Sequence, residues 1–123
     1  MAILGGNVSI YVSDMGQAID FYTQTLGLAL RVRIKNEWAE IDAGGGLTLG
    51  LHPAHEGSAQ PGASGAINIE LAVDDLDAQV AVLRERGVRF VGEIQNYENV
   101  RLATFLDPDQ NALLLAQVLH TGT

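Results

Sequence analysis

The chain has 123 residues, of which 47% are hydrophobic, with no cysteine and a formal net charge of −8. Its length fits one domain with a buried core, and the absence of cysteine excludes a disulfide framework and thiolate chemistry. The acidic charge argues against nucleic acid as a partner, because phosphate binding needs clustered Lys and Arg, and no apolar run is long enough to predict a membrane span. The first residues lack the features of a signal peptide, so we expect a cytoplasmic globular protein.

The first half of the sequence predicts a strand, a helix and three more strands. Residues 7–12 alternate polar and apolar side chains, as a strand with one buried face does. Ser13 or Asp14 is expected to cap a helix that ends at Gly27. Its apolar stripe comprises Met15, Ala18, Ile19, Tyr22 and Leu26. The strands that follow, separated by Gly-containing turns, are expected at 28–34, 37–43 and 47–52.

The second half repeats this order. The stretch NVSIYVSD (7–14) aligns with NIELAVDD (68–75), so that Asn7 meets Asn68 and Asp14 meets Asp75. After a strand at 67–73, Asp74 or Asp75 is expected to cap a helix that closes at Gly87. Three more strands are expected at 88–94, 100–106 and 112–118.

The segment between the halves is rich in Gly, Pro, Ser and Ala and is typical of a linker. We therefore predict one α+β domain with two tandem βαβββ modules, about 5–52 and 66–119, joined by residues 53–65. The helix of each module covers one face of its sheet, and the other face is polar. Curled mixed sheets of this kind are expected to enclose a concave ligand cleft.

Four stretches resemble a known family, the vicinal oxygen chelate superfamily, also called the glyoxalase/bleomycin resistance/extradiol dioxygenase superfamily. They are VSIYVSDMGQAIDFYTQTLGL (8–28), WAEIDAGGGLTLGLHP (38–53), IELAVDDLDAQVAVLRERGVRF (69–90) and ATFLDPDQNALLLAQ (103–117). The resemblance implies paired βαβββ modules, a homodimer, and a pocket in each U-shaped sheet.

The enzymes of that superfamily bind a divalent metal through two His and two carboxylate positions. Carried over one at a time, these positions fall on Asn7, Asn68, Gly50 and Leu114. Leucine and glycine offer no ligand atom on their side chains, and neutral amides are poor ligands for Zn, Fe or Mn. The turn before Leu114 also has Gln110 where the family usually has Gly. We therefore predict that the protein uses no metal and no other cofactor.

Alternation indicates which side chains face the expected cleft. Trp38 and Glu40 share one face of their strand, Thr48 and His52 share one face of theirs, and Glu70 lies beside Asn68. Glu40 and Glu70 have two interpretations of equal weight: a solvated or Arg-paired carboxylate, or a cleft carboxylate that anchors a cation or acts as a base. His52 and His55 are more typical of an exposed loop pair than of a metal site. Arg101 either binds an anionic group or neutralises Glu70.

We interpret the chain as a metal-free binding protein that sequesters a cationic or aromatic small molecule, as bleomycin resistance proteins do. The alternative is a lyase or dioxygenase-type oxidoreductase of the same superfamily that uses a divalent metal or a carboxylate base, and a module without any ligand is the third reading. Catalytic residues are not assigned. The predicted ligand-binding residues are Asn7, Ser9, Tyr11, Trp38, Glu40, Thr48, His52, Asn68, Glu70, Arg101, Phe105 and Leu114. For Phe105, packing in the core is the favoured interpretation.

Overall fold

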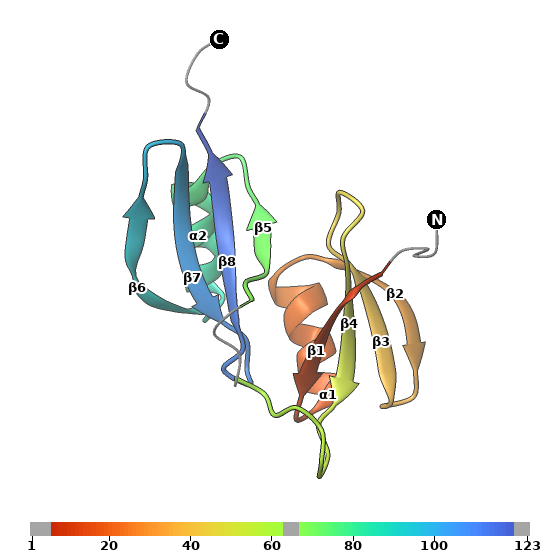
Figure 1. Ribbon diagram of the computed structural model, residues 1–123. Coiled ribbons are helices and arrows are strands. Elements are labelled where there is room, and N and C mark those ends of the chain that lie inside the picture. The colour runs from red at the N-terminus through yellow and green to blue at the C-terminus, as the bar shows by residue number, and fades with distance from the viewer. Residues whose placement is uncertain (1–5, 63–66, 120–123) are drawn as a thin grey trace. The chain divides into compact units, whose positions relative to one another are not determined.

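The computed structural model describes residues 6–62 and 67–119. The chain divides into two compact units, unit 1 (Met1–Pro61) and unit 2 (Gly62–Thr123). Each unit is a four-stranded mixed sheet with helix on one face, as Figure 1 shows. This confirms the prediction of an α+β fold with two tandem βαβββ modules.

Unit 1 has the strand order β1-β4-β3-β2, in which β1 runs parallel to β4 and the other pairs are antiparallel. The face against the helix is the core, and its strand residues are at most 5% exposed: Ile10, Val12, Ala39, Ile41, Leu49 and Leu51. The elements are β1 (Val8–Val12), α1 (Met15–Asp20), the π-helix η1 (Phe21–Thr25), β2 (Ala29–Ile34), β3 (Trp38–Asp42) and β4 (Thr48–Pro53).

The first helix begins where the sequence predicts but does not stay α-helical. The Asp14 side chain accepts a hydrogen bond from the Gln17 N–H at 3.0 Å and caps α1. The hydroxyl of Thr23 donates to the Ile19 carbonyl at 2.6 Å, a side-chain bond to the preceding turn that competes with the regular backbone bond. The helix then widens, and the Leu26 N–H donates to the Phe21 carbonyl at 3.0 Å, the wider spacing of a π-helix.

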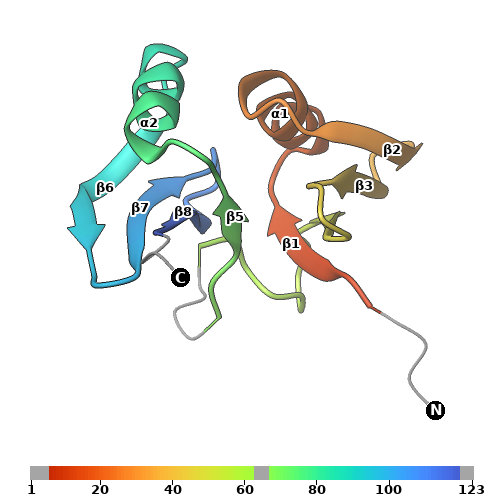
Figure 2. The same ribbon diagram turned by 90° about the horizontal axis from the view of Figure 1, so that it is seen from above.

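Unit 2 repeats the arrangement, with strand order β5-β8-β7-β6. Asp75 caps α2 through the Ala78 N–H at 3.1 Å, and Gln117 of β8 accepts from the Leu76 N–H at 2.8 Å, which ties the first turn of α2 to the sheet. Figure 2 shows α2 lying on one face of this sheet. The elements are β5 (Glu70–Ala72), α2 (Leu76–Glu85), β6 (Arg89–Asn96), β7 (Val100–Leu106) and β8 (Ala112–Val118).

Strand β5 is shorter than the strand expected at 67–73. Pairing with β8 is recorded only for Glu70, Leu71 and Ala72, although the Leu114 N–H still donates to the Ile69 carbonyl at 2.9 Å. Within residues 6–62 and 67–119, no helix is both long enough and apolar enough to cross a membrane.

Candidate functional site

The candidate site is the face of the unit 1 sheet that α1 does not cover, which we call the open face. Because side chains alternate along a strand, the residues paired across the four strands form rows on this face. One row, which we call the aromatic row, contains Tyr11 of β1, His52 of β4, Trp38 of β3 and Ile34 of β2. The next row contains Ser9, Gly50, Glu40 and Val32.

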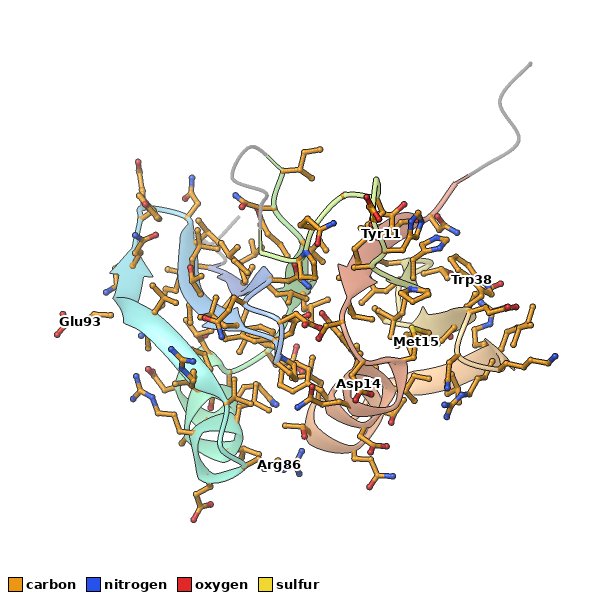
Figure 3. The ribbon with its side chains drawn as sticks, turned by 90° about the horizontal axis from the view of Figure 1, so that it is seen from below. Tyr11, Asp14, Met15, Trp38, Arg86 and Glu93 are labelled. Atoms are coloured by element: carbon orange, nitrogen blue, oxygen red, sulfur yellow. The ribbon has the colours of Figure 1, made fainter. Side chains whose placement is uncertain are left out.

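The rings of the aromatic row contact one another. Tyr11 and His52 are stacked with their centroids 5.3 Å apart and their planes 22° apart, and the centroids of His52 and Trp38 are 4.5 Å apart. All three side chains are half-buried. Figure 3 shows Tyr11 and Trp38 on the side of the sheet away from α1, whereas Met15 lies on the helix side. The Trp38 plane is tilted by 57° from that of His52, so the three rings form an aromatic patch rather than one flat surface, and a planar molecule can pack against this patch.

Trp38 reaches beyond its own row. Its six-membered ring lies against the backbone of Gly50, as the short distances from an ideal Cβ at position 50 to the ring show: 2.7 Å to Cζ3 and 3.2 Å to Cζ2. The indole N–H donates to Oε2 of Glu40 at 3.0 Å. The Trp38 ring therefore has three contacts that fix its position: the Gly50 backbone, the Glu40 carboxylate and the His52 ring.

Glu40 is a carboxylate without a cationic partner among the described residues. Its recorded hydrogen bond comes from Trp38, and the ion pair recorded in residues 6–62 and 67–119 joins Arg101 to Asp77. The guanidinium of Arg33, on the neighbouring strand, donates to the Lys35 carbonyl and to the Asn36 side chain. The half-buried Glu40 carboxylate thus lies beside an aromatic surface with its charge unneutralised by any of these groups.

The other residues predicted for unit 1 surround this centre. Ser9 is paired with Gly50 and is exposed, and Thr48 is half-buried opposite Asp42, whose side chain accepts from the Gly44 N–H at 2.8 Å. Asn7 precedes β1 and is exposed. Sequence reasoning missed the outer edge of the site: Val32 and Ile34 are 38% and 51% exposed and extend the face with apolar surface. Apolar residues of a strand are expected to face the core, whereas pairing with Glu40 and Trp38 places Val32 and Ile34 in the rows of the open face.

Unit 2 carries a different set on its corresponding face. Where unit 1 pairs Ser9 with Gly50 and Tyr11 with His52, unit 2 pairs Glu70 with Leu114 and Ala72 with Ala116. Glu70 and Asn68 are exposed, and Leu114 is 8% exposed. A hollow of about 360 Å³ in this unit is lined by Ala72, Val73, Asp74, Ala116, Gln117, Val118 and Leu119.

Two predicted residues of unit 2 lie on the other side of the sheet. Arg101 and Phe105 share a face of β7 with the buried Ala103, and Phe105 is fully buried and contacts Phe90 with ring centroids 5.9 Å apart. The Arg101 guanidinium donates to both oxygens of Asp77 on α2, at 2.9 and 3.0 Å. This hydrogen bonding lowers the pKa of Asp77 and raises that of Arg101. The expectation that Arg101 faces the cleft or neutralises Glu70 is thus corrected. Arg101 lies on the helix side of the sheet and binds Asp77 of α2.

Comparison with known proteins agrees with this architecture. The sequence profile of the Glyoxalase/Bleomycin resistance protein/Dioxygenase superfamily matches residues 6–115, and the chain belongs to this superfamily. No curated protein matches the sequence.

Solved structures of this kind are numerous, and three illustrate the range. TnmS3, an antibiotic binding protein from Streptomyces sp. CB03234, is 33% identical with a TM-score of 0.74, over 96% of this chain and 98% of that one. A superfamily member from Sphaerobacter thermophilus is 26% identical with a TM-score of 0.78, over 95% and 99%. A lactoylglutathione lyase from Agrobacterium tumefaciens is 17% identical with a TM-score of 0.72, over 93% and 92%, and shows likeness of fold alone.

The divalent metal of the superfamily's enzymes does not fit the residues present. At the four corresponding positions, Asn7 and Asn68 are exposed amides, Leu114 is apolar, and the Trp38 ring fills the space above Gly50. Among residues 6–62 and 67–119, no group of three or more His, Cys, Asp or Glu side chains is placed to hold a metal ion.

Proposed function

We propose that this protein binds a planar, positively charged small molecule on the open face of unit 1 and sequesters it without changing it. The observation that carries the proposal is the aromatic row with the Glu40 carboxylate fixed at its edge by the Trp38 N–H. A planar ring gains dispersion and stacking energy on such a surface, and a cation gains further from the faces of Trp38 and Tyr11.

Charge supports the same ligand class. Glu40 has no recorded cationic partner among the described residues, and the whole chain carries a net charge of −8. A field of this sign raises the local concentration of cations and disfavours anions. The antibiotic-binding function of TnmS3, which is 33% identical, adds support for a binding protein over an enzyme. We also propose that the protein acts as a homodimer in the cytoplasm.

The test is a titration with three probes that separate shape from charge. Acridine orange is a planar cation, fluorescein a planar anion, and tetraethylammonium a cation that is not planar. Trp38 is the sole tryptophan, so its fluorescence reports directly on the site, and calorimetry supplies an independent affinity. We expect acridine orange to bind with a Kd at least about tenfold below those of the other two probes, a difference of about 1.4 kcal/mol.

The matched variant is Glu40→Gln. An amide oxygen still accepts the Trp38 N–H, so the ring keeps its place while the charge is lost. We expect the affinity for acridine orange to fall about tenfold, with an unchanged emission spectrum of the free protein. The proposal would be contradicted if the protein bound all three probes with equal affinity, or if it bound none of them. Recovery of a chemically altered probe would favour an enzyme instead.

A further inference from the structure

We propose that Gly50 is the residue that sets the shape preference of the open face, because its missing side chain gives the Trp38 ring its resting place. The inference rests on the proposed function for the ligand, but its geometric part stands on the structure of unit 1 alone. Gly50 has no side chain with which to contact a ligand. It acts by positioning Trp38.

The reason for glycine at this position is space, not backbone conformation. The φ angle of Gly50 is not positive. The residue lies within β4 and is paired with Ser9 on one side and Glu40 on the other. Alanine would be free to adopt this extended conformation. A Cβ there, however, would lie 2.7 Å from Cζ3 of Trp38 and nearer still to Cη2. Real Cβ atoms essentially never come this close to an atom to which they are not bonded.

The Trp38 ring cannot yield without losing its other contacts. Its N–H is bound to Glu40 at 3.0 Å, and its centroid is 4.5 Å from that of His52. The ring is rigid and moves as a whole about two torsions, so lifting it from position 50 also disturbs the hydrogen bond and the ring contact. With Gly50 the indole rests against the strand and keeps both its hydrogen bond to Glu40 and its contact with His52. With any side chain at 50 it must move, and the arrangement of rings that a planar ligand would contact changes.

The first experiment needs no ligand. We expect Gly50→Ala to shift the emission of Trp38 to longer wavelength and to raise its quenching by acrylamide at least twofold, because the displaced indole is more exposed to water. Gly16→Ala is the matched control, since its Cβ would meet only Asp14 Oδ1 at an ordinary 3.5 Å, and it should leave both readouts unchanged. Emission and quenching identical to the wild type in Gly50→Ala would overturn the proposal.

A double variant separates the effect on Trp38 from a general loss of stability. In Trp38→Ala the space above position 50 is vacated, so adding Gly50→Ala should leave the melting temperature of that variant unchanged, whereas Gly50→Ala alone lowers it. If Gly50→Ala lowers the melting temperature equally in both backgrounds, the clash does not involve Trp38 and the proposal is wrong. This comparison remains decisive if Gly50→Ala alone folds poorly.

The ligand experiment tests the shape preference itself. We expect Gly50→Ala to weaken acridine orange binding at least fivefold and to leave the affinity for tetraethylammonium within twofold, because the Glu40 charge remains. An equal loss for both cations would overturn the role of Gly50 in shape preference. If the wild-type protein binds neither cation, the proposed function fails, while the fluorescence experiments still decide whether Gly50 positions Trp38.

Discussion

The turn between β7 and β8 depends on one buried carboxyl group, that of Asp107, and this dependence can be measured. Asp107 is 3% exposed. Its Oδ1 accepts from the N–H groups of Asp109 and Asn111, both at 2.9 Å, and its Oδ2 accepts from the Asn111 side-chain amide at 2.9 Å. The oxygen of that amide accepts in turn from the Gly62 N–H at 2.6 Å. The amide orientation of Asn111 is therefore fixed from both ends.

We expect Asp107→Asn to destabilise the protein although it changes a single atom. The amide oxygen of the variant can keep the two backbone donors, but its nitrogen must then face the Asn111 nitrogen, which cannot turn because Gly62 holds its oxygen. One bond to a charged acceptor is lost, worth about 1.5 kcal/mol or more, and a poorly solvated donor is left unpaired at a similar cost. The sum is about 3 kcal/mol, which lowers Tm by about 10 °C in a chain of this length.

Urea unfolding followed by circular dichroism measures this change, with Tm as a second readout. Glu98→Gln is the control, because it also neutralises one carboxylate next to a hairpin turn but at an exposed position. The reversed pair Asp107→Asn with Asn111→Asp restores donor to acceptor, so it should recover at least half of the loss. A cost below about 0.5 kcal/mol for Asp107→Asn, within the range of ordinary surface substitutions, would refute the reasoning, as would a reversed pair no more stable than the single variant.

Two further predictions concern unit 2. Gln110 has a φ of 68°, a conformation that costs a residue with a side chain about 1 kcal/mol, so Gln110→Gly should raise the free energy of unfolding by about that amount; an unchanged urea midpoint would contradict this. The Arg101 hydrogen bonds hold the pKa of Asp77 below its ordinary value of 3.8, so this carboxyl stabilises the fold above that pH and loses its contribution as the pH falls through the lowered pKa. Asp77→Asn should therefore have a slightly lower Tm than the wild type at pH 7, with a difference that disappears in strong acid; a difference that stays constant from pH 7 to strong acid would contradict this.

The fold could be predicted because its signals are local. Alternation in residues 7–12 is visible between neighbouring residues, and the alignment of 7–14 with 68–75 compares two short runs of sequence without any contact between them. The two aligned aspartates, Asp14 and Asp75, do cap the two helices. The π-helix that follows α1 was not foreseen. At this point of the helix the Thr23 hydroxyl donates to the Ile19 carbonyl, a contact that a sequence pattern does not specify.

The site could be predicted only in part, because its key contact is not local. Alternation placed Trp38 with Glu40 and Gly50 with His52, but the register between β3 and β4 decides that the indole lies over Gly50. Arg101 was assigned to the wrong face for a different reason. It lies in the same alternation phase as Phe105, and the favoured interpretation of Phe105 as a core residue already implied that Arg101 faces the helix.

The two units show why the repeat does not imply two equal sites. The cross-strand row that holds Tyr11, His52, Trp38 and Ile34 in unit 1 holds no aromatic side chain in unit 2, where its members are Ala72, Ala116, Leu102 and Gln95. The backbone pairing is preserved, so the difference lies in the side chains alone. The groups that we propose for stacking and cation binding therefore lie in unit 1, whereas the corresponding row of unit 2 has small, aliphatic and amide side chains. Because no ring in the corresponding row of unit 2 can compensate for a ring removed from unit 1, Trp38→Ala should weaken planar-cation binding at least as much as Glu40→Gln does, by about tenfold or more.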